Sequence, residues 1–283
     1  MTDRYALFGN PVSHSKSPLI HAAFAQALGH DIHYGLIEAP PGGFAAAALA
    51  FRDSGGKGGN VTTPFKLDAI ALATECLQRA ELAGAANCLK FEPDGRILAE
   101  MFDGVGLVSD IERNLGLALR GKRVLVLGAG GAVRGCLEPL LSRAPAALVV
   151  ANRSPAKAVA LADQFARFGP LRGCGLDEVG DERFDLVLNG TSASLRGETP
   201  ALPDSAYSGA SLAYEMVYGR GLTPFLRHAQ QGGAARVADG VGMLVEQAAE
   251  AWVWWRGVRP DTAPVLAALR AQLTQEADRA PRA

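Results

Sequence analysis

A glycine-rich segment, Gly128–Ala132, follows directly on the apolar run Arg123–Leu127. An apolar, valine-containing run that ends in glycines before a helix-compatible stretch is typical of a strand, a tight turn and a helix start. Gly128 permits the tight turn, and Gly130 lets the backbone approach a phosphate, which the N–H groups and dipole of the following helix favour. The third glycine of the G-x-G-x-x-G pattern is replaced by Val133. The segment predicts binding of a dinucleotide pyrophosphate by Gly128, Ala129, Gly130, Gly131 and Ala132.

The next strand-like run, Leu148–Ala151, ends in Asn152 and Arg153, about twenty residues after the glycine turn, where NAD-binding folds carry an acidic residue for the ribose. An acidic residue would repel a 2′-phosphate, whereas the planar guanidinium of Arg153 would bind one and Lys157 could add charge. The segment therefore predicts NADP(H). The alternative is a solvated basic loop.

Lys66 and Asp103 are the candidates for acid–base chemistry. Lys66 falls in the first turn of an expected helix, where the helix dipole disfavours a cation, and glycines and small polar residues surround it in the sequence. The alternative is an ordinary surface lysine. Asp103 precedes Gly104 and a helix-like run, so it is also a candidate helix N-cap. Position in the sequence does not by itself place the two side chains together.

The segment Ser13–Pro18 offers hydroxyls and positive charge at an expected helix N-terminus, which suits a carboxylate. Ser15 and Ser17 are the candidate ligands. The alternative is capping, because Ser17 before Pro18 is a normal start for a helix.

Several polar residues have both a binding and a structural interpretation. Asn60 and Thr62 are either ligands or hydrogen-bonding turn residues, and Asn87 can bind a ligand or satisfy the backbone of a hairpin. Gln247 lies on an otherwise apolar helical stripe, so its amide must find partners. Those partners are either the backbone or a ligand in a cleft.

The composition excludes several classes of protein. The chain has 283 residues, 28 Lys+Arg against 29 Asp+Glu, and 48% hydrophobic residues, which predicts a folded core without a basic surplus for nucleic acid. No apolar run approaches membrane-spanning length, and the start of the chain lacks a signal-peptide pattern. The cysteines and histidines show no metal-ligand spacing, so no metal is expected, and a reducing cytoplasm is the expected setting. The patterns leave monomer and homodimer open.

Short apolar runs alternate with Ala/Leu-rich stretches, which predicts an α/β fold. Within the second half, strands are expected at 123–127, 147–151, 184–188 and 211–216. Helices are expected at 64–79, 107–119, 243–255 and 264–275, and the runs 86–91 and 97–101 suit a hairpin. We expect a substrate domain from residues 1–103, an inserted Rossmann-type NADP-binding domain over 104–238, and helices in 239–283 that return to the substrate domain, with a cleft between the two domains.

Taken together, these pieces resemble the shikimate dehydrogenase family. The matching motifs cover nearly the whole chain in order, and together they are far more specific than any one of them. They are Tyr5–Pro11, His14–Pro18, Gly59–Lys66, Gly84–Asn87, Asp103–Gly106, the Gly128 turn, Asn152-Arg153, Asn189–Ser192, Met216–Tyr218 and Asp239–Gln247.

The resemblance implies NADPH-dependent reduction of 3-dehydroshikimate to shikimate, with Lys66 and Asp103 as the catalytic pair. It implies that the substrate carboxylate is bound by Ser15, Ser17 and Tyr218 with Thr62 nearby, and the ring hydroxyls by Asn60, Asn87 and Gln247. The implied cofactor residues are the Gly128–Ala132 turn, Asn152, Arg153, Lys157, Thr191, Met216 and Gly240.

The chain departs from the family pattern beside Asp103. Met101 and Phe102 replace the usual Asn-Thr, Cys88 replaces a Thr, and Glu215 replaces an Asp. Drier walls beside Asp103 would weaken polyol binding or admit another ring acid. The alternatives are therefore a related dehydrogenase that prefers quinate or an aminoshikimate-type analogue, or a non-catalytic regulator that binds NADPH or shikimate. Intact Lys66 and Asp103 argue against the regulator.

Overall fold

The computed structural model describes residues 2–219 and 221–279, and it divides into two compact units. The first unit contains the residues up to Gly106 together with Leu244–Val265. The second contains Leu107–Met243 together with the residues from Leu266 onward. Both are α/β units, as predicted.

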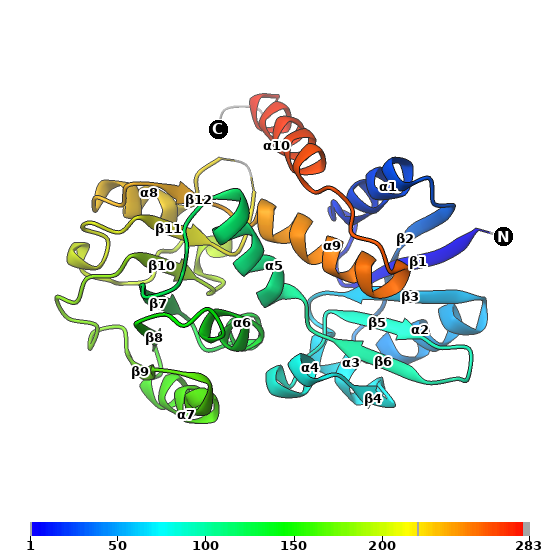
Figure 1. Cartoon of the computed structure of the whole chain (residues 1–283), viewed down its shortest axis with the longest axis horizontal. Helices are drawn as coiled ribbons and strands as arrows, with labels where there is room; N and C mark the ends of the chain where they lie inside the picture. Colours follow the sequence, from blue (N-terminus) through cyan, green and yellow to red (C-terminus); the bar gives the residue numbers. More distant parts are fainter. Residues whose placement is uncertain (1, 220, 280–283) are drawn as a thin grey trace. The chain divides into compact units, whose positions relative to one another are not determined.

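The first unit is built on a six-stranded mixed sheet of order β2-β1-β3-β5-β6-β4 (Figure 1). The strands β1, β2 and β3 are parallel, while β5 runs antiparallel to both β3 and β6. The strand bounds are β1 (Asp3–Gly9), β2 (Ile32–Glu38), β3 (Gly56–Val61), β4 (Glu75–Cys76), β5 (Cys88–Phe91) and β6 (Ile97–Glu100).

Helices cover both faces of this sheet (Figure 1). Residues of β1 alternate in direction, so that Ala6 and Phe8 join one apolar cluster while Tyr5 and Leu7 join another. The first cluster packs under α2 (Phe44–Asp53), α3 (Lys66–Leu72) and α4 (Gln78–Ala83). On the other face lie α1 (Ser17–Leu28) and α9 (Val241–Arg256), of which residues from Leu244 on belong to this unit.

The second unit has a parallel six-stranded sheet of order β12-β11-β10-β7-β8-β9. Its first strand is central, and the chain winds outward to one side and then to the other, which is the doubly wound arrangement. The strand bounds are β7 (Arg123–Leu127), β8 (Ala147–Asn152), β9 (Leu171–Gly175), β10 (Leu186–Asn189), β11 (Leu212–Glu215) and β12 (Val237–Ala238).

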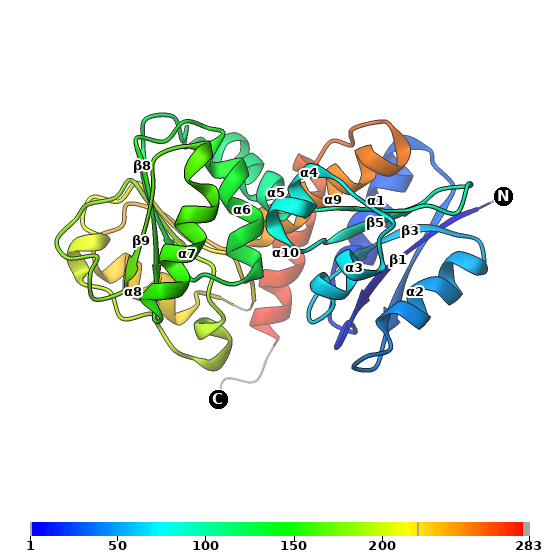
Figure 2. The same ribbon diagram turned by 90° about the horizontal axis from the view of Figure 1, so that it is seen from below.

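Helices α6 (Gly131–Leu141) and α7 (Pro155–Phe165) lie side by side on one face of this sheet, and α8 (Pro224–Gln231) lies on the other (Figures 1 and 2). The unit also contains the π-helical turn η1 (Asp110–Asn114), which continues α5 (Asp103–Ser109). Single-turn 3₁₀ segments occur at Ala166–Phe168, Ala193–Arg196 and Asp204–Ala206.

Three expectations from the sequence differ from this fold. The helix expected over 107–119 spans Asp103–Asn114 instead, as α5 and η1. The last helix, α10 (Ala263–Asp278), is expected in the first unit, but its residues from Leu266 on belong to the second. Within the second unit, Arg270 of this helix forms an ion pair with Asp239 at 3.1 Å. The helix expected over 64–79 stops at Leu72, because Glu75 and Cys76 pair with β6 as an additional strand.

A buried carboxylate in the second unit provides a test of this packing. Asp110 is fully buried and accepts a hydrogen bond from the Tyr214 hydroxyl at 2.7 Å. Tyr207 is equally buried, but its hydroxyl has no hydrogen-bond partner among the described residues. The two tyrosine hydroxyl groups therefore differ in what they contribute to the stability of the fold.

We predict that Tyr214→Phe lowers the free energy of unfolding by about 1–3 kcal/mol, because it leaves a buried carboxyl oxygen of Asp110 without this hydrogen-bond donor. Tyr207→Phe removes an unpaired buried hydroxyl and is expected to be neutral or stabilising. Urea denaturation of both variants checks this. Equal losses for the two variants would contradict the assignment of the Asp110 partner.

Candidate active site

Three segments of the first unit meet at one end of the central strands β3, β5 and β6 of its sheet. Lys66 follows the carboxyl end of β3, Asn87 precedes β5, and Asp103 follows β6. Because β5 runs antiparallel to both β3 and β6, the start of β5 lies at the same edge as the ends of the other two strands. In the register of the sheet, Cys88 lies opposite Asn60 on β3 and opposite Glu100 on β6. The ends of β3 and β6 therefore lie beside the start of β5.

Lys66 and Asp103 form an ion pair at this edge. The Nζ atom of Lys66 lies 2.5 Å from Oδ2 of Asp103, and the two side chains are 24% and 9% exposed. A carboxylate this buried requires compensation, which the ammonium group supplies. The pair is held at a partly open position, where the remaining hydrogens of the ammonium can reach a ligand.

Asn87 fixes the other oxygen of Asp103. The Oδ1 atom of Asn87 accepts from the backbone N–H of Phe102 at 2.8 Å, so its Nδ2 must be the donor group. That Nδ2 donates to Oδ1 of Asp103 at 2.6 Å and to Oε1 of Gln247 at 3.2 Å. The carboxylate of Asp103 is thus held from both sides, by an amide and by an ammonium group.

Gln247 joins the cluster from α9. Its Nε2 donates to the backbone carbonyl of Leu244 at 2.9 Å, and its Oε1 accepts from Asn87. A Cβ added at Gly106 would lie only 2.6 Å from the backbone nitrogen of Gln247, so glycine lets α5 approach α9 closely. The structural interpretation of this amide is confirmed by its bond to the Leu244 carbonyl, whereas binding of a ligand by Gln247 stays a prediction.

Asn60 lies beside the cluster and contacts a tyrosine that the sequence analysis did not single out. The Tyr34 hydroxyl donates to Oδ1 of Asn60 at 2.7 Å, and Nδ2 of Asn60 donates to the backbone carbonyl of Asn87 at 3.3 Å. The ring of His21 stacks on Tyr34 with centroids 4.1 Å apart, and burial lowers the pKa of His21 to about 3. His21 is therefore neutral at physiological pH and adds no charge beside Asn60.

The remaining residues predicted to bind substrate are not hydrogen-bonded to the Lys66–Asp103 pair in the described structure. The Ser15 hydroxyl contacts the Ser17 hydroxyl at 3.2 Å and accepts from the Ser17 N–H. Thr62 donates its backbone N–H to the Phe8 carbonyl at 2.9 Å. Tyr218 belongs to the second unit, where burial raises the pKa of its hydroxyl.

The glycine turn lies in the second unit at the carboxyl end of the central strand β7. Gly128 has a φ of +104°, which L-residues rarely adopt, and its N–H donates to the Ala151 carbonyl at 2.8 Å. Gly130 precedes the first residue of α6. A Cβ added at Gly130 or Gly131 would meet nothing within 4 Å, so open space lies over the start of this helix.

Thr191, Met216 and Gly240 gather near the carboxyl ends of β10, β11 and β12. The N–H of Met216 donates to the Asn189 carbonyl at 3.0 Å, and a Cβ at Gly240 would lie 2.1 Å from the Met216 carbonyl oxygen. A Cβ at Gly128 would contact the Thr191 methyl at 3.2 Å. Ligands of open α/β sheets bind at this edge, next to the point where the strand order reverses.

Two buried polar residues support these loops. Oδ1 of Asn189 accepts from the N–H and the hydroxyl of Thr191 at 3.0 and 2.8 Å. Glu215 is fully buried, and its Oε2 accepts from Asn189, from Ser194 at 2.6 Å and from Thr223 at 3.0 Å. Burial raises the pKa of Glu215, while these donors oppose the rise. Neither residue was predicted to have this role: Glu215 was seen only as a departure from the family pattern. Asn189 directly follows the strand expected at 184–188, and Glu215 lies within the strand expected at 211–216.

The basic residues predicted to bind a 2′-phosphate follow β8. Asn152 ends the strand, and its Nδ2 donates to the Ser154 carbonyl at 3.1 Å. Arg153 and Lys157 are exposed, and Lys157 lies in the first turn of α7. Two cations beside a helix N-terminus suit a phosphate.

Met101 and Phe102, the residues that depart from the family pattern, are both buried. Met101 is fully buried in the cluster under α2, α3 and α4. Phe102 packs with Cys88 and Ala251, and its ring centroid lies 5.7 Å from that of Trp254. Neither side chain forms an open wall beside Asp103. The two departures Cys88 and Phe102 instead touch each other in an apolar cluster.

No group of three or more His, Cys, Asp or Glu side chains that could hold a metal ion occurs among the residues that the structure describes. Over the same residues, no helix combines the length and the apolar character that a membrane crossing requires.

Three family models match this chain. They are the shikimate dehydrogenase substrate binding domain over residues 7–89, shikimate / quinate 5-dehydrogenase over 110–196, and the shikimate 5′-dehydrogenase C-terminal domain over 240–270. The first match covers the segments that carry Lys66 and Asn87, and the second covers the glycine turn and Arg153.

Relatives match over nearly the full length. Shikimate dehydrogenase (NADP(+)) of Nitrosospira multiformis is 55% identical over 96% of this chain and 99% of its own length. An Ael1 enzyme from Pseudomonas putida has a TM-score of 0.91 at 56% identity, over 96% of this chain and 98% of that one. Shikimate 5-dehydrogenase from Thermus thermophilus, solved with NADP(H) and shikimate, has a TM-score of 0.85 at 31% identity, over 96% and 100%.

The fold and the two sites define a two-domain α/β protein with a Rossmann-type nucleotide-binding sheet and a separate polar site on a mixed sheet. The comparisons make the assignment specific. The chain belongs to the shikimate dehydrogenase family.

Because Phe102 is buried in an apolar cluster, we predict that Phe102→Thr acts on stability rather than on the site. The free energy of unfolding should fall by about 3 kcal/mol, as for other large-to-small changes in a core. Leu195→Thr, at a side chain 70% exposed, is the control and should stay within about 0.5 kcal/mol of the unmodified protein. Urea denaturation measures both. A Phe102→Thr variant of unchanged stability but altered kcat/KM for shikimate would restore the view of Phe102 as a wall of the site.

Proposed function

We propose that this protein catalyses the reversible, NADP(H)-dependent reduction of 3-dehydroshikimate to shikimate, with Lys66 and Asp103 as the acid–base pair. The Lys66–Asp103 ion pair, held at the edge of the first unit's sheet, carries the proposal. Relatives that are 54–55% identical over 95–96% of the chain bear the name shikimate dehydrogenase (NADP(+)), which supports both the activity and the cofactor.

Lys66 provides the proton in the direction of reduction. Addition of hydride to a carbonyl carbon places negative charge on the oxygen, and a nearby ammonium group stabilises that charge and then donates its proton. In the direction of oxidation the neutral amine accepts the proton from the hydroxyl. Asp103 orients the Lys66 Nζ atom through the contact at 2.5 Å.

Asn87 positions Asp103 directly and Gln247 does so only through Asn87, so neither acts on the reacting bond in this proposal. The Nδ2 group of Asn87 donates to Asp103 and to Gln247, and its Oδ1 atom accepts from the Phe102 N–H. The proposed roles at the substrate carboxylate (Ser15, Ser17, Thr62 and Tyr218) and at the ring hydroxyls (Asn60 and Gln247) rest on the family motifs in the sequence. The family models cover all of these residues except Tyr218.

The second unit fits the nicotinamide cofactor. Open space over the start of α6, the left-handed Gly128 and the exposed Arg153 and Lys157 suit a pyrophosphate and a 2′-phosphate. We propose that the turn Gly128–Ala132 holds the pyrophosphate, while Asn152, Arg153 and Lys157 surround the 2′-phosphate and the loops of Thr191, Met216 and Gly240 flank the other end. When bound, NADPH supplies the hydride.

We predict that Lys66→Ala lowers kcat by about 10²–10⁴-fold, the usual contribution of a general acid or base. The affinity for NADPH should change little, because the cofactor residues lie in the other unit. Oxidation of shikimate with NADP⁺, followed at 340 nm, measures kcat, and NADPH fluorescence measures binding. Lys57→Ala, at an exposed lysine at the opposite end of β3, is the control. Near-normal kcat in Lys66→Ala would refute the acid–base assignment.

The same assay with quinate and an aminoshikimate tests the substrate. Higher kcat/KM for either than for shikimate would overturn the substrate part of the proposal and leave the Lys66 mechanism standing. Absence of turnover with all three would favour a binding protein.

We predict that Arg153→Gln raises KM for NADP⁺ by about tenfold or more, because a charge-assisted contact to the 2′-phosphate is lost. KM for NAD⁺, which has no such phosphate, should be nearly unchanged. Arg167→Gln, at an exposed arginine of the same unit, is the control. Equal effects on the two cofactors would show that Arg153 does not contact the 2′-phosphate.

A further inference from the structure

A pocket lies in the first unit, at the opposite end of the strands from the Lys66–Asp103 pair. It has a volume of about 490 Å³, within the range of roughly 300–1,000 Å³ typical of small-molecule sites. The start of β3 and the end of β5 line it, whereas the other ends of these segments carry Asn60 and Asn87. Lys57 and Asn60 are therefore roughly 10 Å apart along the strand, which separates the pocket from the proposed active site.

Three residues that line this pocket are aromatic. Tyr5 and Trp255 stack with ring centroids 4.5 Å apart, and Phe91 completes the apolar lining. The indole Nε1 of Trp255 donates to the Leu89 carbonyl at 3.0 Å, which ties the ring to β5. Gly58 on β3 makes this possible, because a Cβ there would lie 2.9 Å from that nitrogen. The indole of Trp255 is thus fixed and partly exposed, with Tyr5 buried beneath it, and a fixed aromatic ring favours stacking of a planar ring.

The rim carries more positive than negative charge. Its charged side chains are Arg52, Lys57, Lys90 and Arg256 against Asp3 and Glu92. Lys90 pairs with Glu92 at 2.9 Å, Arg256 pairs with Asp3, and Arg52 pairs with Asp53 outside the lining. Lys57 is exposed and has no hydrogen bond or ion pair with any residue that the structure describes. Its ammonium group is thus available to an anion.

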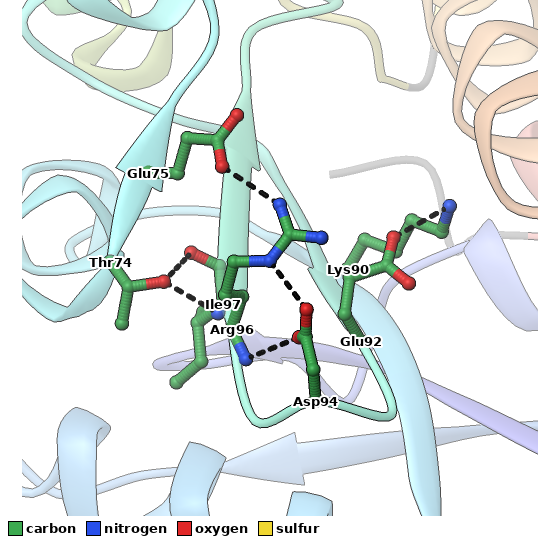
Figure 3. Close-up of polar contacts among 7 residues, drawn as sticks. All are labelled: Thr74, Glu75, Lys90, Glu92, Asp94, Arg96 and Ile97. Carbon is green, nitrogen blue, oxygen red and sulfur yellow. Dashed lines mark hydrogen bonds and ion pairs between the residues drawn. The ribbon is translucent and has the colours of Figure 1, made fainter.

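The β5–β6 hairpin forms one wall and is braced from its far side (Figure 3). Arg96 donates to Asp94 at 2.8 Å and to Glu75 at 3.0 Å, and the Thr74 hydroxyl bonds to both backbone groups of Ile97. These contacts tie the hairpin to β4, so the wall that carries Lys90 and Glu92 is preformed. A preformed site loses little conformational entropy on binding.

We propose that this pocket is a second ligand site, which binds a small anion attached to a planar ring. The ring lies against the partly exposed indole of Trp255, and the anionic group pairs with the ammonium of Lys57. An aromatic phosphate or carboxylate has this chemistry. The site is independent of the activity proposed above.

Phenyl phosphate is a suitable probe of this site. It is titrated into the ¹⁵N-labelled full-length protein, and the indole N–H signal of Trp255, assigned with Trp255→Phe, is followed by NMR. We expect phenyl phosphate to shift the Trp255 indole signal to saturation. Inorganic phosphate and cyclohexyl phosphate should bind at least about tenfold more weakly, because neither can stack. The substitution Lys57→Gln should weaken the binding of phenyl phosphate by about tenfold, because one charge-assisted contact is lost.

Arg120→Gln, which removes an exposed charge from the other unit, is the matched control and should leave the titration unchanged. An unshifted Trp255 signal would overturn the proposal, even if other signals move. So would equal binding of cyclohexyl phosphate, or equal binding by Lys57→Gln and the unmodified protein. Because the readout is binding at Trp255, it does not depend on turnover of shikimate.

Discussion

The burial of the Asp103 carboxylate is the constraint around which the first unit is arranged. A carboxylate that is only 9% exposed is stable as an anion only if charge and hydrogen bonds replace its water. Those partners come from distant parts of the chain. The two direct partners are Lys66, which follows β3, and Asn87, which precedes β5, and Asn87 is in turn hydrogen-bonded to Gln247 on α9. The sheet order and the hairpin bring Lys66 and Asn87 to the carboxylate, and the close approach of α5 to α9 at Gly106 brings Gln247 to Asn87.

Much of this arrangement could be predicted from local patterns. The hairpin expected over 86–101 places Asn87 and the segment before Asp103 at one sheet edge, and the glycine turn after an apolar run marks the nucleotide edge of the other sheet. The Lys66–Asp103 contact could not be derived in this way. It depends on β3 pairing with β5, a contact between elements distant in sequence that no periodicity encodes. Only the family motifs linked the two residues in advance.

The errors have the same origin. Residues 64–79 have a helical pattern, yet Glu75 and Cys76 add a strand to β6, and Thr74 bonds to Ile97 from its side chain. Long-range pairing overrides local propensity there. Met101 and Phe102 were expected to line the site because they adjoin Asp103 in sequence. Their side chains instead enter separate apolar clusters on the two faces of the sheet. Proximity in sequence says little about which way neighbouring side chains point.

The fixed orientation of the Asn87 amide has a consequence for which functional groups fit beside Asp103. Asn87 has no hydrogen left to give, because Asp103 and Gln247 take both. Free donors remain on Lys66, and free lone pairs remain on Asp103. A hydroxyl group satisfies both, since it accepts from one and donates to the other. A ketone accepts from Lys66, as the proposed reduction requires, whereas a protonated amine can only donate and would face the ammonium of Lys66 as a like charge. Oxygen groups and cationic nitrogen groups thus differ beside Lys66 and Asp103 in hydrogen-bond polarity and charge, even where they match in size and shape.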